Sequence, residues 1–127
     1  MSRRSELRCA PLFVLSHTDY REKDLIIRAA VEDQGLCAFI AKGARGSRKR
    51  FAGALDVLVA STCTYSPSDS GLGKITEAAR LPGPEPDPSD ITAFGVRCYC
   101  AELLLGTVQE NFPTRYPFRL MFWVHQA

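Results

Sequence analysis

The sequence of 127 residues lacks long apolar runs, paired cysteines and a strong excess of either charge. No run approaches the roughly 18 apolar residues of a membrane span, and too few apolar residues follow the basic N-terminus for a signal peptide. The five cysteines are odd in number and irregularly spaced, without a Cys-x-x-Cys zinc half-site. This pattern argues against a disulfide framework and favours reduced thiols in small apolar positions. We therefore expect a cytoplasmic protein with no membrane segment.

The sequence also lacks a recognisable catalytic or metal-binding motif. Residues 70–74 resemble a phosphate-binding P-loop, but Ser68 stands where a glycine is required and Ile75 where Ser or Thr is required. Cys98 and Cys100 would lie on different sides of a helix, which makes them a poor metal pair. We expect a binding protein rather than an enzyme, with no cofactor and no metal.

The overall composition is that of an ordinary globular domain, with 24% charged and 46% apolar residues and a net charge of only +2. That small excess excludes the strongly basic class to which histones belong. The charge is unevenly distributed, because residues 1–56 hold eleven Lys and Arg against seven Asp and Glu, whereas residues 57–127 hold five against seven. The basic character is therefore concentrated in the first half of the chain.

Residues 42–50 form the most basic stretch, with five Lys or Arg, two glycines and no carboxylate. Strand-like sequence on both sides predicts a flexible loop held by a β-sheet. Glycines let the backbone approach a ligand closely, and Lys and Arg offer charge-assisted hydrogen bonds to phosphate oxygens. Nucleic acid is the polyanion that such a loop would bind. A solvated loop that is basic without a ligand is the open alternative.

The predicted nucleic-acid contacts are cations that would hold backbone phosphates without reading the base sequence. They are Lys42, Arg45, Arg48, Lys49 and Arg50 of the basic loop, with Arg21, Lys23 and Arg28 extending the track. An aromatic side chain could add base stacking, and the candidates are Tyr20, Phe39 and Phe51. For Phe39 and Phe51 we favour packing in the core.

Apolar alternation bounded by turn signals predicts five short strands. Their ranges are 9–16, 25–31, 36–41, 55–65 and 72–81, with a polar turn at residues 17–23. Gly35 can adopt the positive φ that suits the turn between the second and third strands. Five strands of this size suit a small antiparallel barrel, and the commonest such barrel with a loop-borne binding site is the oligonucleotide-binding (OB) fold.

Residues 82–88 contain four prolines in seven positions and predict a stiff linker. Beyond it the apolar spacing changes to alternating steps of three and four, which predicts an amphipathic helix that reaches residue 112. Residues 116–124 begin a second core helix. The expected class is α+β, with an OB-fold domain at 1–81 and a partial helical domain at 89–127. The helices either cap the barrel, belong to a helical domain that has been cut short, or are covered by a partner.

Four segments carry a resemblance to a known family. They are residues 20–24, residues 33–35 leading into 41–45, residues 50–55 and residues 72–78. In this order and spacing they resemble the N-terminal domain of the RecO family of bacterial DNA repair proteins. The resemblance implies an OB barrel in a recombination mediator that binds single- and double-stranded DNA and anneals complementary strands. It also implies that RecR is a partner in loading RecA onto DNA covered by single-strand DNA-binding protein.

Three features depart from the family pattern. Asp56-Val57-Leu58 stands where the family commonly has a Gln-Pro-Phe-like run, most of the helical domain is missing, and the cysteine zinc site of some members is absent. Binding to single-strand DNA-binding protein, which is ascribed to the helical part, is therefore not implied for this chain. The alternative from another class is a protein-interaction module, in which the barrel and helix dock a repair partner without direct DNA binding.

Overall fold

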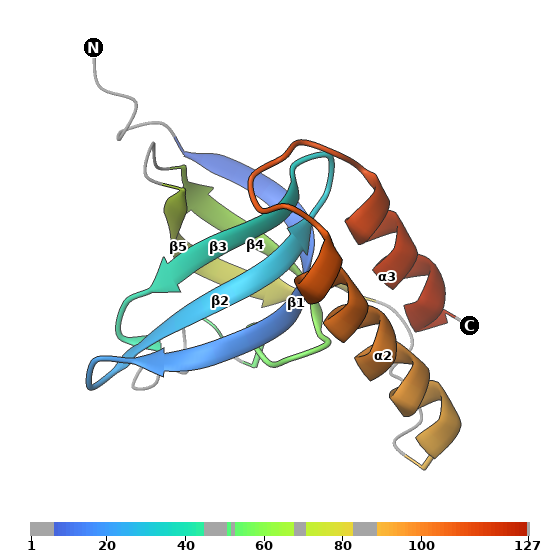
Figure 1. Cartoon of the computed structure of the whole chain (residues 1–127). Helices are drawn as coiled ribbons and strands as arrows, with labels where there is room; N and C mark the ends of the chain where they lie inside the picture. The colour runs from blue at the N-terminus through green and yellow to red at the C-terminus, as the bar shows by residue number, and fades with distance from the viewer. Residues whose placement is uncertain (1–6, 45–50, 52, 68–70, 83–88, 127) are drawn as a thin grey trace.

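The computed structural model describes residues 7–44, 51, 53–67, 71–82 and 89–126. Within these ranges the chain forms five strands followed by two helices (Figure 1). The strands are β1 (Arg8–Tyr20), β2 (Asp24–Val31), β3 (Gly35–Ala41), β4 (Ala60–Ser66) and β5 (Leu72–Arg80). The helices are α2 (Ile91–Thr107) and α3 (Tyr116–Gln126). The predicted class, a small barrel followed by a helical segment, is confirmed.

The five strands close into a barrel in the order β1–β2–β3–β5–β4, as in an OB fold. Four of the five strand pairs are antiparallel, but β3 and β5 are parallel, so the expectation of an entirely antiparallel barrel is wrong for this pair. β1 pairs with two neighbours, because Arg8–Phe13 lies against β4 and Leu12–Tyr20 against β2. It therefore continues through residues 17–20, where we expected a turn.

Residues 55–59 form turns rather than the start of a strand, and β4 begins at Ala60. The prediction of a strand from residue 55 is therefore wrong in its first five positions. Leu58 adopts a φ of 68°, which a β-strand does not permit. Leu55 is apolar because the turn carries it into the barrel interior, where it is buried. Its hydrophobicity reflects core packing and not strand alternation.

Buried side chains form two clusters, one inside the barrel and one between the barrel and the helices. The inner cluster includes Leu12, Val14, Ile27, Val31, Phe39, Cys63, Tyr65 and Ile75. The outer cluster includes Phe13, Leu15, Ala30, Leu36, Ala101, Leu104, Phe118 and Met121. Because successive side chains of a strand point to opposite faces, neighbours such as Leu12 and Phe13 belong to different clusters.

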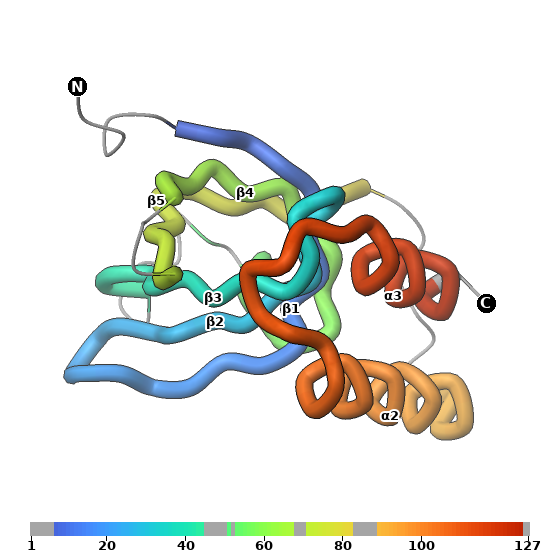
Figure 2. Tube along the Cα trace, turned by 45° about the horizontal axis from the view of Figure 1, so that its top comes forward, coloured from blue at the N-terminus to red at the C-terminus, as the bar shows by residue number. Residues whose placement is uncertain are grey.

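The helices α2 and α3 lie side by side along one side of the barrel (Figure 2). The side chain of Asp90 caps α2 by accepting a hydrogen bond from the N–H of Ala93 at 3.0 Å. The helix ends at Thr107, before the predicted residue 112, since Val108 is already extended. No helix in the part of the chain described is long and apolar enough to cross a membrane. The division into an OB-fold domain, a linker at 82–88 and a helical domain stays a prediction.

Gly35 is required both by the β2–β3 turn and by the α2–α3 connection, residues 108–115. Its φ is 81°, which confirms the expected positive value and is a conformation that glycine adopts readily. A Cβ at this position would also collide with the carbonyl oxygen of Phe112. The connection between the helices therefore passes directly over the start of β3.

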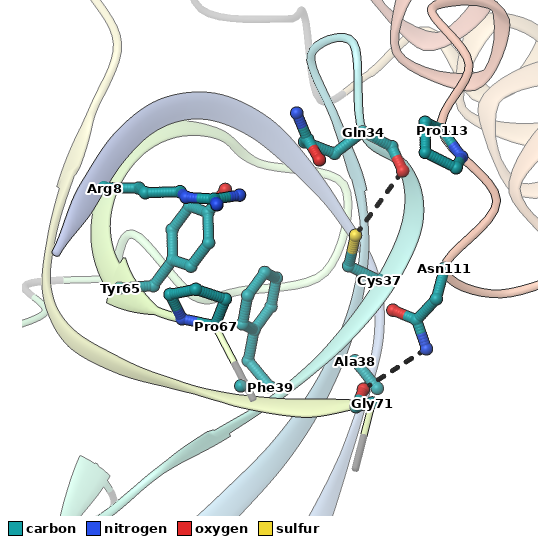
Figure 3. Close-up of a pocket in the computed structure, with 11 residues that line it drawn as sticks. Arg8, Gln34, Cys37, Ala38, Phe39, Tyr65, Pro67, Gly71, Asn111 and Pro113 are labelled. Atoms are coloured by element: carbon teal, nitrogen blue, oxygen red, sulfur yellow. Dashed lines mark hydrogen bonds between the residues drawn. The ribbon is translucent and has the colours of Figure 1, made fainter. Parts of the chain in front are cut away.

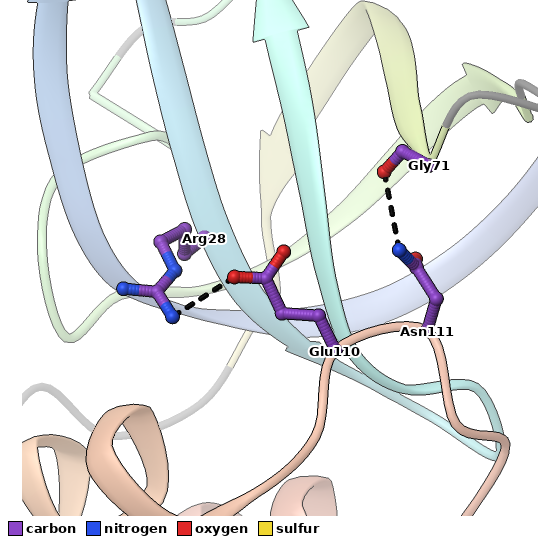
Figure 4. Close-up of polar contacts among 4 residues, drawn as sticks. All are labelled: Arg28, Gly71, Glu110 and Asn111. Carbon is purple, nitrogen blue, oxygen red and sulfur yellow. Dashed lines mark hydrogen bonds and ion pairs between the residues drawn. The ribbon is translucent and has the colours of Figure 1, made fainter.

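Polar contacts join the α2–α3 connection to β2, to β3 and to Gly71, the residue before β5 (Figure 4). The N–H of Asn111 donates to the carbonyl oxygen of Leu36 at 2.7 Å, and its side-chain amide donates to the carbonyl oxygen of Gly71 at 3.4 Å. The guanidinium of Arg28 lies 2.9 Å from the carboxylate of Glu110. The helical segment is thus held to the barrel by polar contacts as well as by the outer cluster.

Candidate nucleic-acid interface

The β1–β2 turn and the start of the β3–β4 loop lie together at the end of the barrel away from the two helices (Figure 1, Figure 2). At this end of the barrel, the last pair between β1 and β2 is Tyr20 with Asp24. The last pair between β2 and β3 is Leu25 with Ala41. The two loops therefore leave the sheet from neighbouring strands at the same level. Three of the expected contact residues lie in these loops and are exposed: Arg21, Lys23 and Lys42.

A hydrogen bond joins the two loops directly. The N–H of Gly43 donates to the Oδ1 oxygen of Asp24 at 2.8 Å. Gly43 adopts a φ of 69°, which few other residues would adopt without strain. The bond fixes the backbone immediately after Lys42 against the turn that carries Lys23. The basic loop therefore begins at a defined place beside the β1–β2 turn.

Arg21 has a backbone φ of 58°, which is uncommon outside glycine. Its guanidinium carbon lies 5.0 Å from the centroid of the Tyr20 ring, within cation–π distance. Tyr20 is 37% exposed and thus the surface aromatic among the three stacking candidates. Phe39 and Phe51 are buried in the inner cluster, as favoured from the sequence.

The charges of the β1–β2 turn alternate in sign. Arg21, Glu22, Lys23 and Asp24 follow one another, so this turn carries no net charge. A positive potential at this end of the barrel therefore depends on the basic loop that begins at Lys42. The other loop cations, Arg45, Arg48, Lys49 and Arg50, lie outside the residues that the structure describes. Their contact with DNA stays a prediction.

The outer face of β2, β3 and β5 adds a lysine that sequence reasoning missed. Ile26, Ile40 and Lys74 are neighbours across these three strands, and Lys74 is exposed. They point outward, because the adjacent Ile27 and Phe39 belong to the inner cluster. Alternation along β5 could have placed Lys74 on the outside of the barrel. Only the parallel β3–β5 pairing places it beside β3.

Arg28, which was expected to extend the track, is paired with a carboxylate of the α2–α3 connection. It lies on β2 opposite Ala38, and its Nη2 atom is 2.9 Å from an oxygen of Glu110. Both side chains are about two-thirds covered. The guanidinium therefore has a partner on the α2–α3 connection, where it serves to attach the helices.

The family model described as "Recombination protein O N terminal" matches residues 10–81, which include nearly all of the barrel. The chain belongs to the RecO family. A relative from Listeria monocytogenes serotype 4b (strain CLIP80459), "DNA repair protein RecO", is 27% identical over 111 residues. A protein of the same name from Anaeromyxobacter sp. (strain K) is 32% identical over 112 residues.

The match to the RecO relatives extends beyond the barrel but covers only part of those proteins. The two alignments cover 87% and 85% of this chain, so the similarity continues from the barrel into the helical segment. Each covers 43% of the relative. The chain therefore spans less than half the length of the RecO proteins that it matches.

A small cavity opens between β3, the end of β4 and the α2–α3 connection (Figure 3). Its volume is about 110 Å³, and its lining includes Phe39, Tyr65, Arg8 and Asn111. The rings of Phe39 and Tyr65 lie 4.9 Å apart and belong to the barrel core. Pockets for small molecules usually begin near ~300 Å³. We therefore assign this cavity no ligand.

Two of the three barrel cysteines, Cys37 and Cys63, have the properties of core residues, whereas Cys9 on β1 is exposed, contrary to the expectation for the thiols. Burial raises the pKa of Cys37 to about 11, with a smaller contribution from the carboxylate of Glu110. Burial likewise raises the pKa of Cys63 to about 12. Both thiols stay protonated at neutral pH and are poor nucleophiles or metal ligands. Among the residues described, no three His, Cys, Asp or Glu side chains are grouped to hold a metal ion.

Proposed function

We propose that this chain is the DNA-binding barrel of a RecO-type recombination mediator, which binds single- and double-stranded DNA and anneals complementary strands. The observation that carries the proposal is the bond from Gly43 to Asp24, which sets Lys42, the first residue of the basic loop, beside the turn of Arg21 and Lys23. A barrel of the RecO family, with relatives named as DNA repair proteins, supports DNA as the polyanion.

In this proposal the chain acts by charge neutralisation and not by catalysis. Lys and Arg side chains that replace the counterions of the phosphates bind DNA without a sequence preference. Tyr20, beside Arg21, offers a stacking surface for an unpaired base. Neutralising two complementary strands lowers their mutual repulsion and raises their rate of encounter. Annealing therefore needs no nucleophile, base or cofactor.

The proposed partners follow from the RecO family. The chain would work in the cytoplasm with RecR, on DNA that single-strand DNA-binding protein covers and RecA then occupies. A direct contact with single-strand DNA-binding protein is not part of the proposal, because this chain covers less than half of its relatives.

The test is fluorescence anisotropy of labelled single-stranded DNA titrated with protein at several salt concentrations. If about four to five phosphates are neutralised, a plot of log K against log salt has a slope of roughly −3. Changing Arg45, Arg48, Lys49 and Arg50 to Ala flattens this slope. A smaller variant, Lys23→Ala with Lys42→Ala, removes two charges from the described part of the same site.

The matched control is Arg115→Ala with Arg119→Ala, which removes two exposed cations at the helices. We expect this control to bind DNA nearly as the wild type does, whereas the Lys23 and Lys42 variant binds more weakly. Equal losses in both variants would mean that only net charge matters and would reject the assigned site. Absence of salt-dependent binding by the wild type would reject DNA binding itself.

A protein-interaction module is the second candidate, and the apolar surface of the helices favours it. Tyr99 on α2 and Trp123 on α3 are 67% and 71% exposed. In that case the barrel and helices dock a repair partner and the basic loop binds an acidic peptide. Competition separates the two functions, because a peptide-specific loop would keep its affinity when DNA is in excess.

A further inference from the structure

The outward face of β2 is open near the basic end and covered near the helices. Ala30 is buried in the outer cluster, between the barrel and the helices. Arg28, two residues earlier, is only about two-thirds covered, and Ile26, two residues earlier again, is also partly exposed. Successive side chains on one face of a strand are two residues apart. Arg28 is therefore the last outward side chain of β2 before the helical segment covers the sheet.

Two rows of paired residues cross the open part of this face, and paired residues share one face of a sheet. The first row is Thr18, Ile26, Ile40 and Lys74, and the second is Ser16, Arg28, Ala38 and Leu72. Each row contains one cation and no carboxylate. The strands themselves therefore offer no acidic partner to either cation on this face.

These two cations continue the line that begins at Lys42. Lys42 is two residues beyond Ile40, which pairs with Lys74. Ile40 is two residues beyond Ala38, which pairs with Arg28. Two residues of a strand span about 7 Å, so the line reaches about 13 Å from the basic end toward the helices. A row of cations along a sheet face is a surface that the backbone of a single strand can follow.

The carboxylate of Glu110 already occupies the last cation of this line (Figure 4). The Nη2 atom of Arg28 lies 2.9 Å from the Oε2 atom of Glu110. The Nε atom of Arg28 has no hydrogen-bond partner among the residues described, so this contact is not the side-on fork that uses Nε. Carboxylate and phosphate oxygens accept the same charge-assisted bonds from a guanidinium. Glu110 therefore lies where a DNA phosphate could bind to Arg28.

Backbone contacts hold Glu110 at this position independently of its charge. Glu110 forms a parallel β-bridge with Leu36, and the N–H of the next residue, Asn111, donates to the carbonyl oxygen of Leu36 at 2.7 Å. The connection also passes so close to Gly35 that a Cβ there would collide with the carbonyl oxygen of Phe112. Neutralising Glu110 should therefore free Arg28 without detaching the connection.

We propose that Glu110 sets the end of the DNA track, by holding Arg28 in place of a phosphate and repelling the phosphate that would come next. This role rests on the DNA binding proposed for Lys42 and the basic loop. Lys74 then belongs to the DNA site of the wild type, whereas Arg28 joins the site only when Glu110 loses its charge. Bound DNA accordingly stops short of the helices.

The test is anisotropy of labelled single-stranded DNA over a range of salt for the wild type, Arg28→Ala, Glu110→Gln and the double variant. Glu110→Gln should bind DNA about threefold to fivefold more tightly at low salt. One added phosphate contact should also steepen the slope of log K against log salt by about 0.7. Lys74→Ala should flatten the slope by the same amount. The matched control is Glu102→Gln, which removes an exposed carboxylate of α2.

In the Arg28→Ala background, Glu110→Gln should raise the DNA affinity no more than the control does. Thermal melting establishes that each variant is folded. A gain for Glu110→Gln no larger than that of Glu102→Gln overturns the proposal, and so does a gain that persists without Arg28. A wild type that binds DNA but shows no such gain in its Glu110→Gln variant rejects this role alone. A wild type that does not bind DNA rejects the proposed function and this role with it.

Discussion

The helix side of the barrel and its basic end are held together by different kinds of interaction. On the helix side, Phe13 of β1 is fully buried, and its ring lies 5.3 Å from that of Phe118 and 6.3 Å from that of Phe122. At the basic end, the β1–β2 turn and the start of the β3–β4 loop are joined by the hydrogen bond from Gly43 to Asp24. The first side depends on apolar packing, and the second on a half-buried polar contact.

This difference separates stability from binding. Apolar burial contributes most of the free energy of folding, whereas exposed polar contacts contribute about 1 kcal/mol or less each. Changes on the helix side should therefore lower the free energy of unfolding and leave the DNA affinity of the folded protein unchanged. Changes at the basic end should lower the DNA affinity and leave the free energy of unfolding nearly unchanged.

The largest effect is expected for Phe13→Ala. Its truncation leaves a cavity between β1 and α3 and should cost about 3–5 kcal/mol of the free energy of unfolding. Urea denaturation followed by circular dichroism measures this loss, with Trp123→Ala as the exposed aromatic control. A loss for Phe13→Ala no larger than that of the control would show that the helices do not stabilise the barrel.

Gly35→Ala is expected to have the next largest effect. The new Cβ meets the carbonyl oxygen of Phe112, and a φ of 81° is strained for alanine. The expected loss in the free energy of unfolding is about 1–3 kcal/mol. Gly95→Ala is the control, because a Cβ there meets nothing within 4 Å and alanine favours a helix. Equal melting temperatures for the two variants would contradict the close approach of the α2–α3 connection.

Local patterns in the sequence were sufficient for most of the strands and for the presence of both helices, although Ile91 and Phe94 of the expected apolar stripe on α2 are exposed. β2, β3 and β5 lie within one or two residues of their expected ranges. Residues 55–59 misled the prediction, because apolar residues that close a barrel from within a turn resemble a strand. The parallel pairing of β3 with β5 joins residues more than thirty positions apart, which no local pattern contains.

For the candidate site, the sequence indicated which cations to consider but not how they lie relative to one another. Arg28 was assigned to the DNA track because it is a cation on an outward strand position, but its partner, Glu110, is 82 residues away in the chain. Lys74 was missed because its neighbour Ile40 is known only from the barrel register. The proximity of the β1–β2 turn to the basic loop likewise depends on the pairing of β2 with both neighbours.

At the basic end, comparing Asp24→Ala with Asp24→Asn isolates the bond between the two loops. Both variants lose the negative charge, but Asn keeps an oxygen that accepts from the N–H of Gly43. We expect Asp24→Ala to bind DNA about twofold to fivefold more weakly than Asp24→Asn, for a hydrogen bond of about 1 kcal/mol or less. Anisotropy at fixed salt measures the ratio. Identical affinities would mean that the bond does not position the loop.

The smallest effect belongs to the ion pair between Arg28 and Glu110, which attaches the α2–α3 connection. Because both side chains are partly exposed, their coupling should be about 0.5 kcal/mol and should fall as salt rises. A double-mutant cycle of Arg28→Ala and Glu110→Ala, measured by urea denaturation at low and high salt, gives this coupling directly. Arg28 lies outside the proposed DNA track. Arg28→Ala should therefore lose no more DNA affinity than a variant that removes a distant charge, such as Arg115→Ala. A loss of DNA affinity as large as that of the Lys23 and Lys42 variant would return Arg28 to the track. The DNA site would then extend along β2 toward the helices.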